Sequence, residues 1–176
     1  MKDKKVKSAS GRTKKSGSKK FGFLIIAAIL IIATIYYFYS AEQAQIRGYN
    51  FGNELQAIQD DLKGEQTDFY SKVSMWKEAS ITKDQILEYG HTHVLRMNDI
   101  IAKYSDLQFT DVFSGSVKLF KLSTETQLQS DQHLLSWIEN DDEAEKIRAD
   151  ELLQASFEYE MAGLASFEKA KRNLNP

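Results

Sequence analysis

The sequence predicts an all-α protein in which one N-terminal transmembrane helix precedes an extracytoplasmic antiparallel four-helix bundle. Three observations predict this fold class. An unbroken stretch of uncharged, mostly apolar residues covers 21–39. After it, apolar residues recur three or four positions apart in successive segments, which is the spacing of amphipathic helices. Alternating β-type patterns are absent, and the single proline is the last residue of the chain.

The segment 21–39 has the length of a membrane-spanning helix. At about 1.5 Å of rise per residue it reaches about 28 Å, close to the thickness of the hydrocarbon core. It is longer than a usual signal-peptide core and lacks a suitable cleavage site, which favours an uncleaved signal anchor. A cleaved signal peptide and a prepilin-like leader are the alternatives. The residues expected to anchor the chain in lipid are Phe21, Leu24, Ile25, Ile29, Leu30, Tyr36, Tyr37 and Tyr39.

Charge is distributed very unevenly around this segment, although the net charge is only −2. Residues 1–20 hold nine Lys or Arg and one Asp, whereas residues 41–176 hold 14 basic and 24 acidic residues. Basic flanks remain on the cytoplasmic side of a membrane. We therefore expect a single-pass protein of the cell membrane with a cytoplasmic N-terminus and an extracytoplasmic bundle. The absence of cysteine and of glycosylation sequons favours a prokaryotic source.

Residues 1–20 are rich in Lys, Ser and Gly, which predicts a disordered cytoplasmic tail. Its charge either sets the membrane orientation alone or also contacts anionic lipid headgroups. No aromatic residue is interleaved with the lysines, so no nucleic-acid partner is expected.

The bundle is expected over residues 41–176. Its predicted helices cover about 41–79, 83–104, 111–139 and 142–172. Thr82 and Gln85 have the spacing of a capping box, Thr110 or Asp111 can cap the third helix, and Asn140-Asp141-Asp142 can cap the fourth. A coiled coil through the first helix is possible, but its heptads are short.

Each predicted helix carries an apolar stripe that should face the core. The first stripe includes Leu55, Ile58, Leu62, Phe69, Val73 and Trp76. The second is Ile86, Tyr89, His93, Met97, Ile100 and Tyr104. The third includes Phe113, Val117, Phe120, Leu128, Leu134, Leu135 and Ile138. The fourth is Ile147, Leu153, Phe157, Met161, Leu164 and Phe167.

Two sets of residues are candidate metal ligands. Glu88 and His91 form a Glu-x-x-His motif of the kind that di-metal bundles use, with His93 nearby, but the required second copy is missing. His93 and Met97 lie four apart and could bind a soft metal such as Cu(I). A hydrogen-bonded core histidine beside a space-filling methionine is the favoured interpretation. No metal or other cofactor is therefore expected.

Catalytic groups are not evident in the sequence. There is no cysteine, nucleophile elbow or glycine-rich phosphate loop, and the paired acids suit solvated helix faces. Tyr70 and Tyr159 fall beside the apolar stripes rather than on them, so they are candidate surface contacts for a protein partner.

Together these features predict a non-catalytic, membrane-anchored module that binds a protein partner or a second copy, or has a structural role in a membrane assembly. The first alternative is a ligand-sensing domain, because the layout is similar to the extracytoplasmic four-helix sensor of bacterial chemoreceptors. That resemblance is one of layout from the span onward and includes no motif. Those receptors also have a second span and a cytoplasmic signalling region, so sensing would need a partner. The second alternative is a metal-binding bundle.

Overall fold

The computed structural model describes residues 46–174, and these residues form a purely helical bundle. Its elements, in order, are α2 (Ile46–Lys77), α3 (Lys83–Asp106), a short 3-10 helix η1 (Asp111–Phe113), α4 (Ser114–Asn140) and α5 (Glu143–Leu174). Within the described residues, the ends of these helices lie within a few residues of the predicted ones, apart from the start of the third helix. The predicted tail, membrane span and first turn of the first helix lie outside the described residues.

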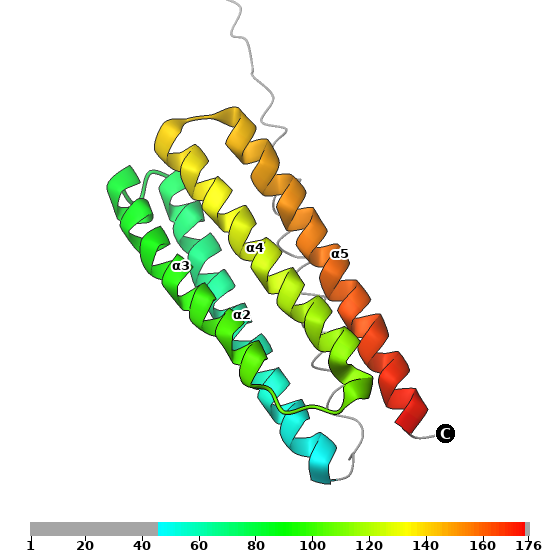
Figure 1. Ribbon diagram of the computed structural model, residues 1–176. Coiled ribbons are helices and arrows are strands. Elements are labelled where there is room, and N and C mark those ends of the chain that lie inside the picture. Colours follow the sequence, from blue (N-terminus) through cyan, green and yellow to red (C-terminus); the bar gives the residue numbers. More distant parts are fainter. Residues whose placement is uncertain (1–45, 175–176) are drawn as a thin grey trace, which may run out of the picture.

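The four long helices run side by side and alternate in direction (Figure 1). Because each connection is short, consecutive helices are antiparallel neighbours. Because the four long helices alternate in direction, α2 begins and α5 ends at the same end of the bundle (Figure 1). Within residues 46–174, no helix combines the length and the apolar character that crossing a bilayer requires.

The connection between α2 and α3 is fixed by backbone hydrogen bonds and a capping box. Ala79 adopts a left-handed φ of 57°, and the N–H of Ser80 donates to the carbonyl of Met75 at 2.8 Å. This pattern ends a helix by satisfying its last carbonyl groups. Thr82 then accepts from the N–H of Gln85, whose side chain accepts from the N–H of Thr82, which confirms the predicted capping box.

The third helix does not begin as predicted. Residues Asp111–Phe113 form a 3-10 turn, and the Thr110 side chain makes no capping hydrogen bond. The α-helix starts at Ser114. The fourth helix does use the predicted cap, because Asp142 Oδ1 accepts from the N–H of Ala144 at 2.9 Å.

Apolar side chains form two separate core clusters. The larger cluster surrounds Phe51, Met97, Phe113 and Phe167, near the end of the bundle where α2 begins. The smaller one surrounds Phe69 and contains Ile86 and Ile138, toward the opposite end. Polar side chains separate the two clusters, as described below.

Helices α4 and α5 are the most closely packed pair, because small residues line the seam between them. These residues recur every seventh position, as Ser116, Ser123 and Ser130 on α4 and as Ala149, Ser156, Gly163 and Ala170 on α5. Ser123 Oγ donates to the carbonyl of Ser156 at 2.8 Å, and Ser130 Oγ donates to the carbonyl of Ala149 at 2.7 Å. The buried serines thus satisfy their hydroxyl groups while allowing the two backbones to approach.

The predicted core face of the fourth helix is wrong at two positions. Ile147 is 59% exposed and Met161 is 51% exposed. The face of α5 that packs against α4 instead consists of small residues. This orientation of the helix leaves Ile147 and Met161 exposed. Apolar periodicity therefore identified Leu153 and Phe167 as buried but missed the small residues that pack against α4.

The seam can be tested by enlarging Gly163. A Cβ atom there would already lie 3.0 Å from Phe120 Cδ1, so leucine has no space without moving α4 away. We expect Gly163→Leu to lower the free energy of unfolding by about 1–3 kcal/mol, as overpacking does. The matched control is Ala162→Leu, because Ala162 is exposed on the same helix. Equal stability of the two variants in chemical denaturation would show that the seam is not tight.

Candidate functional site

The four candidate metal ligands do not gather at one place. Glu88 and His91 are exposed on α3, whereas His93 and Met97 are both 0% exposed in the core. Because His91 and His93 are two positions apart in the helix, their side chains point to different sides of it. The Glu-x-x-His motif therefore lies on the surface without a second histidine beside it.

His93 is the centre of the most unusual arrangement in the bundle. Its Nδ1 lies 2.9 Å from Glu65 Oε1 on α2, and its Nε2 lies 3.0 Å from Asp131 Oδ2 on α4. Phe69 covers the imidazole with its ring centroid 4.0 Å away and the planes 6° apart. A side chain on α3 is thus held between carboxylates from the two neighbouring helices.

This geometry favours a protonated imidazole. An ionised carboxylate only accepts hydrogen bonds, so two such partners are both satisfied when each ring nitrogen of His93 carries a proton. Burial lowers the pKa of His93, but hydrogen bonds and charge from Asp131, and then from Glu65, outweigh it and raise the pKa above 6.5. The surroundings of His93 therefore stabilise its charged form.

Asp131 is fully buried, and hydrogen-bond donors surround its carboxylate. Besides His93, Gln66 Nε2 donates to its Oδ2 at 2.9 Å and the Tyr70 hydroxyl donates to its Oδ1 at 3.0 Å. Burial and the adjacent charge of Asp131 raise the pKa of Tyr70 well above 10, so the hydroxyl remains a donor. The Tyr70 hydroxyl therefore points into the core, and the ring is half-buried rather than free for a partner.

The hydrogen bonds continue into the remaining helix and out to the surface. Gln127 Nε2 donates to Gln66 Oε1, and Ser156 on α5 donates to Gln127 Oε1. Toward the surface of α3, Arg96 Nη1 lies 3.3 Å from Glu65 Oε2. We call this connected set the polar layer; it comprises Glu65, Gln66, Tyr70, His93, Arg96, Gln127, Asp131 and Ser156 and includes all four long helices.

The polar layer explains why His93 and Met97 are unsuited to a metal. Both nitrogens of His93 are committed to hydrogen bonds, so neither has a lone pair to offer. The Met97 sulfur accepts from Gln66 Nε2 at 3.5 Å. Among the residues that the structure describes, no three His, Cys, Asp or Glu side chains are placed to bind a metal ion. The interpretation of His93 as a hydrogen-bonded core histidine is confirmed.

The sequence also indicates the polar layer, through acidic residues at positions within the apolar stripes. Glu65 lies between Leu62 and Phe69 in the stripe of α2, and Asp131 lies between Leu128 and Leu134 in the stripe of α4. Both acids therefore fall on the core face of their helix at helical spacing. Charged residues at core positions are rarely buried unless they are paired, and His93 was the available cation.

A second polar group lies within the larger apolar cluster. Gln59 Nε2 donates to the Tyr104 hydroxyl at 2.7 Å, and the hydroxyl of Thr124 lies 3.2 Å from the same oxygen. Glu160 on α5 is 9% exposed and is an electrostatic neighbour of Tyr104. Burial raises the pKa of Glu160 to about 7, because its charged form is poorly solvated there.

The His93 and Asp131 side chains lie inside the bundle, away from solvent. His93 and Asp131 are 0% exposed, so no substrate could reach them while the helices remain packed.

No protein-family model, curated protein or solved structure matches this chain. Its function is therefore inferred from its own residues and their geometry.

The charged contacts of His93 predict that the bundle loses stability at alkaline pH. Because the folded-state pKa of His93 lies above its unfolded value of 6.5, its contribution is complete below pH 6.5 and is lost as pH rises through the folded-state pKa. At pH 6 we expect His93→Gln to cost about 3–5 kcal/mol, since it leaves Asp131 buried without a cation and Glu65 with Arg96 as its remaining one. Chemical denaturation across pH 5–9 measures both effects.

His91→Gln is the control for this measurement, because His91 is exposed on the same helix. The series should be made in a Glu160→Gln background, so that Glu160 does not titrate in the same range. If the His91 and His93 variants had equal stability at every pH, the buried ion pairs would not contribute to folding.

Glu160 makes a separate prediction with a defined pH range. Its folded-state pKa of about 7 exceeds the ordinary value of 4.5, so the protein loses stability as pH rises from 4.5 to 7. Glu160→Gln should therefore raise the free energy of unfolding at pH 8, by at most about 3 kcal/mol, and change little at pH 4.5. Glu158→Gln, at an exposed position of α5, should show no such dependence. A pH-independent effect of Glu160→Gln would rule out a buried titrating carboxyl group.

Proposed function

We propose that the chain is a non-catalytic, single-pass membrane protein whose helical bundle binds a partner protein or a second copy of itself. Support for the anchor comes from the uncharged segment 21–39 and from the basic residues before it. The ends of the described chain agree with this topology, because α2 starts and α5 finishes at one end of the bundle (Figure 1). A span preceding α2 would leave the bundle at that end, with the acidic remainder outside the cell.

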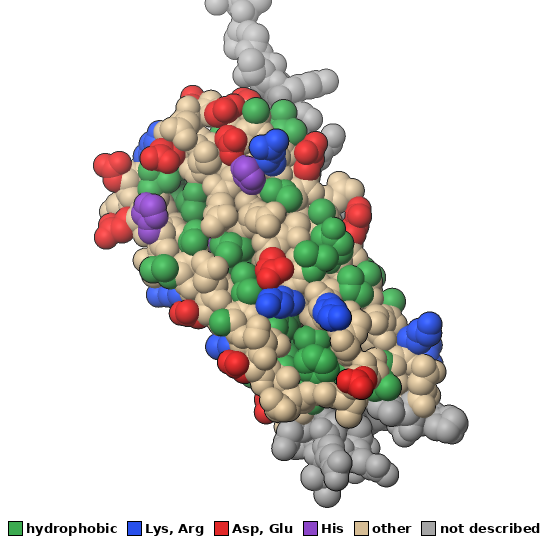
Figure 2. All heavy atoms as spheres, in the orientation of Figure 1, with side chains coloured by type: hydrophobic (Ala, Val, Ile, Leu, Met, Phe, Trp, Pro, Cys, Tyr) green, Lys and Arg blue, Asp and Glu red, His purple; other side chains and the backbone are tan. Residues whose placement is uncertain are grey.

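The observation that carries the binding role is an exposed apolar strip on the second half of α5. Met161 is 51% exposed, and Ala162 and Ala165 are also exposed. Ala165 adjoins both other positions on the helix surface, because it lies four residues from Met161 and three from Ala162. Figure 2 shows apolar side chains gathered over α5, with few charges between them.

The composition of this strip favours a helical partner. Alanines allow close approach of another helix, and a flexible methionine can fill an irregular gap between surfaces. Glu158 and Lys169 lie at either end and provide one charge of each sign for the rim. Tyr159 is 36% exposed beside the strip and remains a candidate contact, as an aromatic ring with a polar tip.

A ligand-sensing role is the second candidate function. It is favoured by the polar layer, because a hydrogen-bonded network through all four helices could relay a local change to the whole bundle. The metal-binding alternative has no such support, since the candidate ligands are either exposed or already hydrogen-bonded.

Site-specific crosslinking in intact membranes tests the binding role. A photo-crosslinking amino acid at Met161 should give one reproducible crosslinked product, whereas the same residue at Ala102, which is exposed on α3, should give much less. Mass spectrometry of the product then separates a second copy of this chain from a different protein.

Equal labelling from positions 161 and 102, or no product from either, would contradict a partner surface on α5. The anchor is tested independently by adding protease to intact cells. Digestion of the acidic bundle is expected, and complete protection would contradict the proposed orientation.

A further inference from the structure

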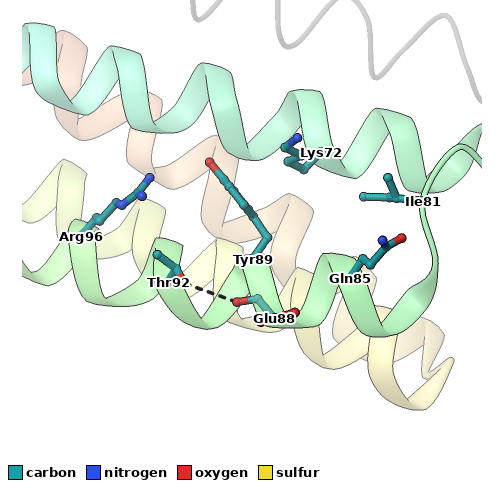
Figure 3. Close-up of a pocket in the computed structure, with 7 residues that line it drawn as sticks. All are labelled: Lys72, Ile81, Gln85, Glu88, Tyr89, Thr92 and Arg96. Atoms are coloured by element: carbon teal, nitrogen blue, oxygen red, sulfur yellow. Dashed lines mark hydrogen bonds between the residues drawn. The ribbon is translucent and has the colours of Figure 1, made fainter.

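A groove of about 410 Å³ lies between α2 and α3, on a different part of the surface from the α5 strip (Figure 3). Most of its lining comes from one stripe of α3, because the positions involved repeat at three or four residues. The lining residues are Lys72, Ile81, Gln85, Glu88, Tyr89, Thr92 and Arg96.

The side chains in the groove place two cations on opposite sides of a tyrosine. Tyr89 extends from α3 toward α2, with Arg96 on one side and Lys72 on the other (Figure 3). Lys72 Nζ lies 5.9 Å from the centre of the Tyr89 ring. Glu88, which also lines the groove, lies below Tyr89 in this view (Figure 3).

Arg96 is held in position by the polar layer and by a side-chain hydrogen bond with Tyr89. Its Nη1 contacts Glu65 Oε2 at 3.3 Å, and Glu65 is fixed in turn by His93. A guanidinium group has five N–H donors, so others remain available in a side chain that is 52% exposed. A cation that is already oriented loses little conformational freedom when an anion binds.

Tyr89 supplies a neutral donor between the cations. Burial, together with the charges of Glu65 and Asp68, raises the pKa of its hydroxyl, so the group keeps its proton at physiological pH. The centre of the groove thus offers an O–H donor, the planar fork of an arginine and the point charge of a lysine. Arginine and lysine are the usual partners of carboxylate oxygens.

We propose that this groove binds a small dicarboxylate, with one carboxylate on Arg96 and the Tyr89 hydroxyl and the other on Lys72. Two cations on either side of Tyr89 give two separate points of contact, and a monocarboxylate can use only one of them. The ligand carbon chain would lie against the Tyr89 ring. This site is independent of the α5 strip, and it places the ligand one contact away from the buried ion pairs of His93.

Thermal unfolding of the full chain in detergent micelles, with succinate as the probe, tests the assignment. The rings of Trp76 and Trp137 pack at 5.5 Å in a T-shaped pair, so their fluorescence reports unfolding. Because a ligand that binds only the folded state raises Tm, succinate should raise Tm in a saturable way. Sodium chloride at matched ionic strength, acetate and phosphate should each have a smaller effect.

Lys72→Gln is the primary variant, because Arg96 also supports Glu65 and its loss could impair folding. We expect Lys72→Gln to weaken succinate binding by about tenfold, and Tyr89→Phe to weaken it as well. The matched control is Lys118→Gln on α4, which should bind like the parent chain. A succinate effect no larger than that of acetate, phosphate or sodium chloride would overturn the proposal, as would unchanged binding by Lys72→Gln.

Discussion

The arrangement of the helices depends on one imidazole ring with two hydrogen bonds. His93 on α3 contacts Glu65 on α2 and Asp131 on α4, so a single side chain connects three helices in the middle of the bundle. Charges removed from water are costly unless they are paired and hydrogen-bonded. Each of these three side chains consequently restricts how its helix can rotate or slide, because any other register would leave a buried charge without a partner.

The rest of the core is organised around this constraint. The polar layer separates an aromatic-rich cluster near the start of α2 from a smaller cluster around Phe69. Apolar packing alone tolerates many similar arrangements of four helices, whereas a hydrogen-bonded network of fixed partners favours one of them. The seam of small residues between α4 and α5 adds a second constraint, since only one register matches Ser123 with Ser156 and Ser130 with Ala149.

These constraints also determine the two surfaces to which we assign binding, the α5 strip and the groove between α2 and α3. On α5, the small residues occupy the buried seam, and Met161 is therefore left on the outside. On α3, the network holds Arg96 at the surface because Glu65 is fixed by His93. Both surfaces are thus consequences of how the core is built. A change in the protonation of His93 would alter the support of Arg96 through Glu65.

The sequence by itself determined the helical fold, the number of helices in the bundle and most of their ends. Helical periodicity, the capping box at Thr82 and the Asp142 cap are local properties, so they can be recognised from residues close together in the chain. Only the tertiary structure decided which face of α5 is buried and which partners His93 has. Both depend on contacts between residues far apart in the sequence: His93 is 28 residues from Glu65 and 38 from Asp131, and no local pattern links them.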